Sequence, residues 1–143
     1  MTHGTVTVRH PDGYPVDLDR GVVELVQAMW DVLIATTQSC EDPHGDGYAW
    51  VAFESFEHLR RLVTLVGARR DDRDGSLWRR MTAHDIASPD STPELAGEWR
   101  YRVLPLAPSR PDEPWQFAAA VEFPRSDAGE MIARLRAHGA SAP

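Results

Sequence analysis

The chain has 143 residues, of which 42% are apolar and 26% are charged. These values are typical of one globular domain with a single core, and no apolar run is long enough to cross a bilayer. The formal charge of −7 argues against non-specific binding to nucleic acid, because such binding depends on neutralising phosphates with basic side chains.

Cysteine usage and the first residues bear on the compartment. Cys40 is the only cysteine, so no internal disulfide can form. No charged segment followed by an apolar stretch opens the chain, and we therefore expect a cytoplasmic protein without a signal peptide. The absence of lysine and asparagine indicates a GC-rich, actinobacteria-like genome rather than a function.

The first predicted elements are a strand and a long helix. Thr5 to Arg9 alternates as a short strand would, and Pro11-Asp12-Gly13 ends it with a turn. A helix is predicted from Asp19 to Leu33, and a brief strand from Ile34 to Thr37 follows it. The helix prediction depends on an apolar stripe with a spacing of three to four residues, formed by Leu18, Val22, Leu25, Met29 and Leu33.

The middle of the chain contains a buried strand and a second helix. Tyr48 to Phe53 is apolar on both faces, which predicts a central strand. Ser55 is a suitable N-cap for a helix that ends at Gly67. Arg69 to Asp74 is expected to be a solvated turn, and Ser76 to His84 one or two helical turns before a loop.

Two strands and a helix are predicted in the last third. Glu98 to Leu104 reads as a strand with one more polar face, and Trp115 to Phe123 is the clearest strand pattern of the chain. The prolines between these strands predict an extended loop. Ser126 or Asp127 caps a last helix that is expected to end at Gly139.

Two segments share one pattern, in which a strand ending in Phe is followed by a serine and an amphipathic helix. They are Tyr48 to Gly67 and Phe117 to Gly139. We expect a single α+β domain over residues 1–143, with an antiparallel or mixed sheet covered by about three helices, and a ferredoxin-like arrangement fits this pattern. Residues 1–13 and 140–143 are expected to be weakly ordered.

Reactive and polar residues crowd the loop before Tyr48. Because binding groups often lie on loops held by a rigid scaffold, we expect this loop at the mouth of a pocket between the sheet and the helices. The predicted ligand-binding residues are Ser39, Cys40, Glu41, His44 and Tyr48. The main hypothesis is a module that binds a small molecule or a protein, and no motif indicates a cofactor.

An enzyme is the first alternative. Cys40 could act as a nucleophile with His44 as its base, although the neighbouring acidic residues disfavour a thiolate. Cys40 and His44 could also begin a zinc site completed by His58, Asp42 or Asp46, but no further Cys or His pair has zinc-finger spacing, so no metal site is predicted. A structural homodimer, formed through the strand that carries Trp99 and Tyr101, is the second alternative.

The stretch from Trp30 to Phe53 resembles a group of small bacterial and phage-associated proteins. In these a helix leads into T-T-x-S-C-E, then a glycine-containing loop and a strand Y-x-x-V-x-F, and the downstream V-x-F-P at Val121 to Pro124 belongs to the same pattern. The matching residues are Thr36, Thr37, Ser39, Cys40, Glu41, Tyr48, Val51 and Phe53. This resemblance implies no particular activity.

A more distant likeness is to the wybutosine-synthesis methyltransferase of tRNA modification, whose motif joins T-T-x-S-C to a glycine and a basic residue. Asp42 and Pro43 stand at those two positions in this chain.

Overall fold

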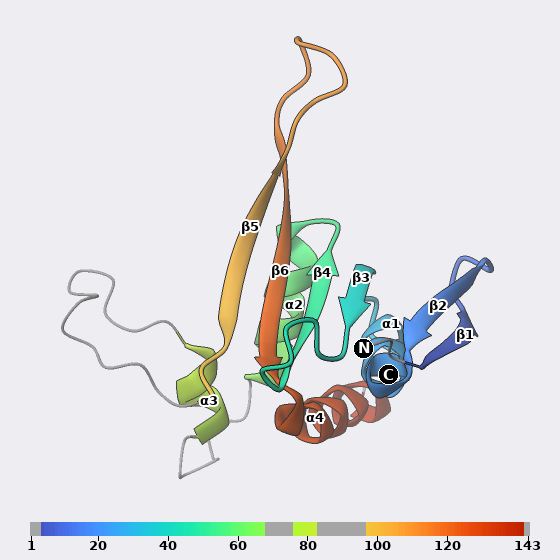
Figure 1. The fold of residues 1–143 in the computed structure, drawn as a ribbon, viewed down its shortest axis with the longest axis vertical. Helices are drawn as coiled ribbons and strands as arrows, with labels where there is room; N and C mark the ends of the chain where they lie inside the picture. Colours follow the sequence, from blue (N-terminus) through green and yellow to red (C-terminus); the bar gives the residue numbers. More distant parts are fainter. Residues whose placement is uncertain (1–3, 68–75, 83–96, 142–143) are drawn as a thin grey trace, which may run out of the picture.

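The computed structural model describes residues 4–67, 76–82 and 97–141 (Figure 1). These residues form four α-helices and two antiparallel sheets, which confirms the predicted single-domain α+β fold. The elements in chain order are β1 (Thr5–Arg9), β2 (Pro15–Asp19), α1 (Val23–Asp31), β3 (Thr36–Cys40), β4 (Tyr48–Phe53), α2 (Phe56–Val66), α3 (Ser76–Met81), β5 (Arg100–Leu106), β6 (Gln116–Pro124) and α4 (Ala128–Ser141). Within this described part of the chain, no helix combines the length and the apolar character that a membrane crossing requires.

The four-stranded sheet is the element against which the helices pack. Its strand order is β3-β4-β6-β5, and every neighbouring pair is antiparallel. The central pair, β4 and β6, runs from Tyr48 opposite Pro124 to Phe53 opposite Ala119. The prediction of a central strand at Tyr48 to Phe53 is therefore confirmed, and Val51 in its middle is fully buried.

The chain passes through this sheet as two β-hairpins, each followed by a helix. The first unit is β3-β4-α2 and the second is β5-β6-α4, with α3 between them. This succession is a circular permutation of the βαββαβ order of a ferredoxin-like chain. The two segments that share a sequence pattern thus contribute the two central strands, which lie side by side.

The helices build one core against one face of the sheet (Figure 1). α1 and α2 contact the strands, and α4 packs against both of these helices. The largest fully buried side chains are Phe53, Phe123, Leu25, Met29, Ile34, Leu62, Met131 and Leu135. β5 and β6 continue past the end of β4 as a long projecting hairpin (Figure 1).

The predicted start of the first helix is wrong. Pro15–Asp19 is a strand that pairs with β1, and a short 3₁₀ turn separates it from α1, which begins at Val23. Leu18 causes the ambiguity, because it belongs to the helical stripe and also alternates with Val16 toward the interior of the hairpin. The turn at Pro11 to Gly13 joins two strands instead of ending one.

The C-terminus of α1 also differs from the prediction, because the helix closes before Leu33. The N–H of Leu33 donates to Trp30 O at 3.0 Å, and the N–H of Ile34 donates to Met29 O at 2.9 Å. This is a Schellman motif, which places Leu33 in a left-handed conformation with φ of 66°. Since Ile34 completes the motif, the strand predicted from Ile34 begins at Thr36 instead.

The remaining boundaries shift by small amounts. β5 begins at Arg100 and β6 at Gln116, one or two residues after their predicted starts. α4 continues past Gly139 to Ser141, because Gly139 does not adopt the left-handed conformation that ends a helix. The turn predicted at Arg69 to Asp74 and most of the loop predicted after His84 lie outside the described residues.

A buried ion pair fastens α3 to the start of α4. The Arg80 guanidinium donates two hydrogen bonds to the Asp127 carboxylate, one of them at 2.9 Å. The indole N–H of Trp99 donates to the same carboxylate at 2.9 Å. Asp127 is 7% exposed, so its charge requires these partners.

We expect Leu33→Gly to raise the free energy of unfolding by about 0.5–1 kcal/mol, because glycine adopts the left-handed conformation without the steric cost that leucine bears. The Leu33 side chain is 79% exposed, so its removal sacrifices little burial. Urea unfolding measures the change. Leu33→Ala is the matched control, since it shortens the side chain but keeps Cβ, and we expect no gain from it. Equal destabilisation of both variants would contradict this explanation.

Candidate functional site

The loop between β3 and β4, residues 41–47, is held at both ends. At its start the Glu41 N–H donates to the Asp19 carboxylate at 3.0 Å. At its end the Gly47 carbonyl accepts a hydrogen bond of 2.9 Å from the Arg125 N–H. Gly45 and Gly47 both have positive φ, of 70° and 81°, which glycine adopts without strain. The loop is thus fixed to β2 on one side and to the end of β6 on the other.

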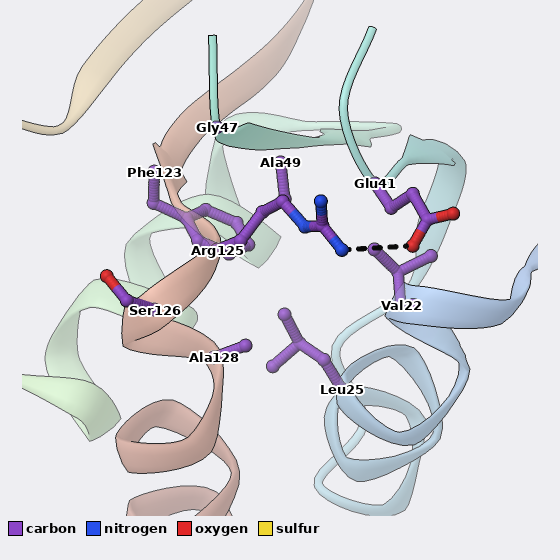
Figure 2. A pocket seen from close by; sticks show the side chains of 10 residues that line it. Val22, Leu25, Glu41, Gly47, Ala49, Phe123, Arg125, Ser126 and Ala128 are labelled. Atoms are coloured by element: carbon purple, nitrogen blue, oxygen red, sulfur yellow. Dashed lines mark ion pairs between the residues drawn. The ribbon is translucent and has the colours of Figure 1, made fainter. Parts of the chain in front are cut away.

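A cavity of about 440 Å³ lies beneath this loop, on the helix side of the sheet (Figure 2). It is lined by Gly21, Val22, Leu25, Glu41, Gly47, Ala49, Phe123, Arg125, Ser126 and Ala128. Figure 2 shows the side chains of Val22, Leu25 and Ala128 around the space below the Arg125 side chain. The floor is therefore apolar, and the charged groups lie at the rim.

Arg125 supplies the positive charge of the rim. Its guanidinium lies 3.6 Å from a Glu41 carboxylate oxygen and 3.8 Å from an Asp42 carboxylate oxygen. Direct hydrogen bonds between charged groups are about 2.7–2.9 Å long, so both contacts are looser than that. The Arg125 side chain is 51% exposed, and it therefore remains accessible from outside.

Glu41 owes its position to a glycine. A Cβ placed on Gly21 would clash with the Glu41 Oε2 atom, so no larger residue fits there unless the carboxylate moves. Gly21 belongs to the 3₁₀ turn that precedes α1. A carboxylate beside the N-terminal turn of a helix is stabilised by the helix dipole.

Cys40 ends β3 and is half-buried. Burial has the largest effect and raises the pKa of its thiol. A hydrogen bond from the Asp42 backbone opposes this shift, and the carboxylates of Asp19 and Glu41 raise the pKa further. The thiol is therefore the favoured form at neutral pH. The acidic neighbours act in the direction that the sequence predicts, but burial is the larger cause of the raised pKa.

The other residues of the enzyme and zinc hypotheses are not brought together. His44 is exposed on the outer part of the loop, and among the contacts of the described residues none joins its ring to Cys40. His58 lies on α2, where its Nδ1 accepts a hydrogen bond of 3.1 Å from the Ala35 N–H. Within residues 4–67, 76–82 and 97–141, no three His, Cys, Asp or Glu side chains gather as a metal site would require.

Ser39 and Tyr48 lie outside the cavity beneath the loop. Ser39 lines a different hollow of about 450 Å³ between β3 and the β1–β2 hairpin, and its Oγ is buried without a hydrogen-bond partner. Tyr48 lies on the opposite face of the sheet from Ala49. Its hydroxyl donates to Glu98 O at 2.8 Å, and the Arg100 guanidinium lies 4.0 Å from its ring centre. Of the five predicted ligand-binding residues, Glu41 alone lines the cavity beneath the loop.

Sequence reasoning missed the residues that complete this cavity. Arg125 and Ser126 come from the 3₁₀ turn directly after β6, and Gly21 and Leu25 come from the segment predicted as continuous helix. One signal was present, because Arg125 directly follows the V-x-F-P pattern at Val121 to Pro124. The antiparallel pairing of β4 with β6 is what brings that pattern to the loop.

Because its pKa is raised, we expect Cys40 in the folded protein to react with iodoacetamide more slowly than in the unfolded chain at every pH below about 8.5. The pH at half-maximal rate should lie above that of the unfolded chain. His44→Ala is expected to leave the profile unchanged. A depressed apparent pKa that disappears in His44→Ala would instead support the enzyme hypothesis.

Comparisons with protein-family models, with curated proteins and with solved structures give no match for this chain. The resemblance to the small T-T-x-S-C-E proteins and the distant likeness to the tRNA methyltransferase motif therefore stay predictions.

Proposed function

We propose that this chain is a small-molecule-binding module whose ligand occupies the cavity beneath residues 41–47. The observation that carries the proposal is a hollow of about 440 Å³ with apolar residues on its floor and Arg125 and Glu41 at its rim, where Asp42 lies 3.8 Å from the Arg125 guanidinium. Small-molecule sites typically have volumes of about 300–1,000 Å³, apolar walls and a few polar groups that orient the ligand.

The attachment of the loop supports the same proposal. Asp19 holds its first residue and Arg125 holds its last, so the rim is ordered before a ligand arrives. A site that is ordered in advance loses less conformational entropy on binding. The walls come from regular elements, since Leu25 belongs to α1, Ala49 to β4 and Ala128 to α4.

The enzyme alternative has less support. A nucleophilic cysteine needs a lowered pKa and a base within hydrogen-bond reach, whereas the pKa of Cys40 is raised and His44 is an exposed loop residue. We therefore assign Cys40 no chemical role in the proposed function.

Filling the cavity should abolish ligand binding. Ala128 lines the cavity at the start of α4, so Ala128→Leu places a larger side chain inside it. Ala133 is exposed on the same helix, and Ala133→Leu is the matched control. We expect ligand-observed NMR with a library of amino acids, carboxylates, amines and neutral fragments to find compounds that bind the original chain and the Ala133 variant but not the Ala128 variant.

Near-ultraviolet circular dichroism verifies that each variant is folded. Two results would overturn the proposal: no compound binding to the original chain, or compounds that bind the Ala128→Leu variant equally well.

Self-association through the projecting β5–β6 hairpin is a second candidate function. Its specific support is the exposure of large apolar side chains on that hairpin: Val103, Leu106, Trp115 and Phe117. Contiguous exposed apolar surface often marks an interface. The sequence predicts a dimer contact through the strand that carries Trp99 and Tyr101. In the structure Trp99 is buried, and the Tyr101 hydroxyl donates a hydrogen bond to Met81 O, so the exposed residues of the hairpin tip replace them in this candidate interface.

Charge does not select the partner of this hairpin, because Arg100, Arg102 and Arg110 already pair with Asp46, Glu122 and Glu113 of the same chain. Pro105 lacks an N–H on the edge strand β5, which disfavours edge-to-edge strand pairing and favours contact through the apolar side chains.

If this candidate is correct, the native mass should rise toward that of a dimer as protein concentration increases. Replacing Trp115 and Phe117 by Ser should return the protein to a monomer, as measured by sedimentation equilibrium. Tyr14→Ser, which changes an exposed aromatic residue on the β1–β2 hairpin, is the control and should leave the mass unchanged. A monomeric original chain at every concentration would exclude the candidate.

A further inference from the structure

We infer that the ligand of the cavity beneath residues 41–47 is a small zwitterion, an α-amino acid with an apolar side chain. This inference rests on the proposed function and names the chemical class of its ligand. It assigns the ligand carboxylate to Arg125, the ligand ammonium to Glu41 and Asp42, and the ligand side chain to the apolar floor.

The hydrogen bonding of the Arg125 guanidinium argues for a carboxylate group on the ligand. Its guanidinium carries five N–H donors, yet among the described residues none accepts a direct hydrogen bond from it. Glu41 and Asp42 hold the guanidinium at 3.6 and 3.8 Å, so the charge is balanced while the donors remain available. A carboxylate matches the planar guanidinium with two parallel hydrogen bonds.

The two acidic residues argue against a simple anion. A carboxylate ligand at Arg125 would lie beside Glu41 and Asp42, and like charges at such distances repel. A simple cation would instead meet the guanidinium. A ligand that carries both charged groups on one carbon atom, as an α-amino acid does, can place its carboxylate at the guanidinium and its ammonium at the two carboxylates.

The apolar floor of the cavity determines which side chain the ligand carries. Val22, Leu25 and Phe123 are buried apolar residues, and Ala49 and Ala128 are small enough to leave space between them. Figure 2 shows that this space lies directly below the ion pair of Glu41 and Arg125. A zwitterionic head group at the rim therefore directs an aliphatic or aromatic side chain into the hollow.

The test is isothermal titration calorimetry of the full chain with L-leucine and L-phenylalanine as probes. N-acetyl-leucine lacks the ammonium, leucinamide lacks the carboxylate and glycine lacks the side chain. We expect each of these three compounds to bind at least about tenfold more weakly than leucine, the effect of losing one charged hydrogen-bonding group or the buried side chain. Equal binding of N-acetyl-leucine or leucinamide would overturn the zwitterion assignment.

Variants identify the residues. Arg125→Gln and Glu41→Gln should each weaken leucine binding, whereas Arg136→Gln, which changes an exposed arginine paired with Glu24 on α1, should not. The ligand analogues need no variant, so the test stands even if Arg125→Gln fails to fold. If leucine and phenylalanine do not bind but other compounds bind and are lost in Ala128→Leu, this inference fails while the proposed function survives. If no compound binds, both fail.

Discussion

The antiparallel pairing of β4 with β6 is the interaction on which the rest of the structure depends. It joins two hairpins into one sheet, and it gives the helices a continuous apolar face to cover. The same pairing continues into the hydrogen bond from the Arg125 N–H to Gly47 O. The cavity beneath the loop is therefore a direct result of how the two halves of the chain meet.

Local patterns in the sequence are sufficient to predict most of the helices and strands of the fold. The strand at Tyr48 to Phe53 was predicted to the residue, because both of its faces are apolar and its ends are marked by glycine and serine. The start of α1 was not, because Leu18 satisfies a strand and a helix equally well. The pairing of Pro15–Asp19 with β1 makes this segment a strand, and a local sequence pattern carries no information about that pairing.

The candidate site was predicted in part for the same reason. The loop was recognised from its polar residues, and Glu41 does line a cavity. Arg125 was beyond reach, because it lies far along the chain and its contact with Glu41 requires the register of two strands. His44 and Tyr48 are close to Glu41 in sequence but do not line the cavity, because His44 is exposed on the loop and Tyr48 lies on the opposite face of β4 from Ala49.

The permuted order of the chain also bears on how the protein folds. Both outer strands reach their neighbours through hairpins, so β4–β6 is the one pairing in the described sheet that closes a long loop. The entropy of that closure should dominate the folding barrier. Because closure entropy grows slowly, doubling the length of the segment between α2 and β5 would cost about 0.6 kcal/mol. A slip of one residue between β4 and β6 would be far more damaging, since it would turn the buried Val51 and Phe53 away from the helices and bring Trp50 and Ala52 into the core in their place.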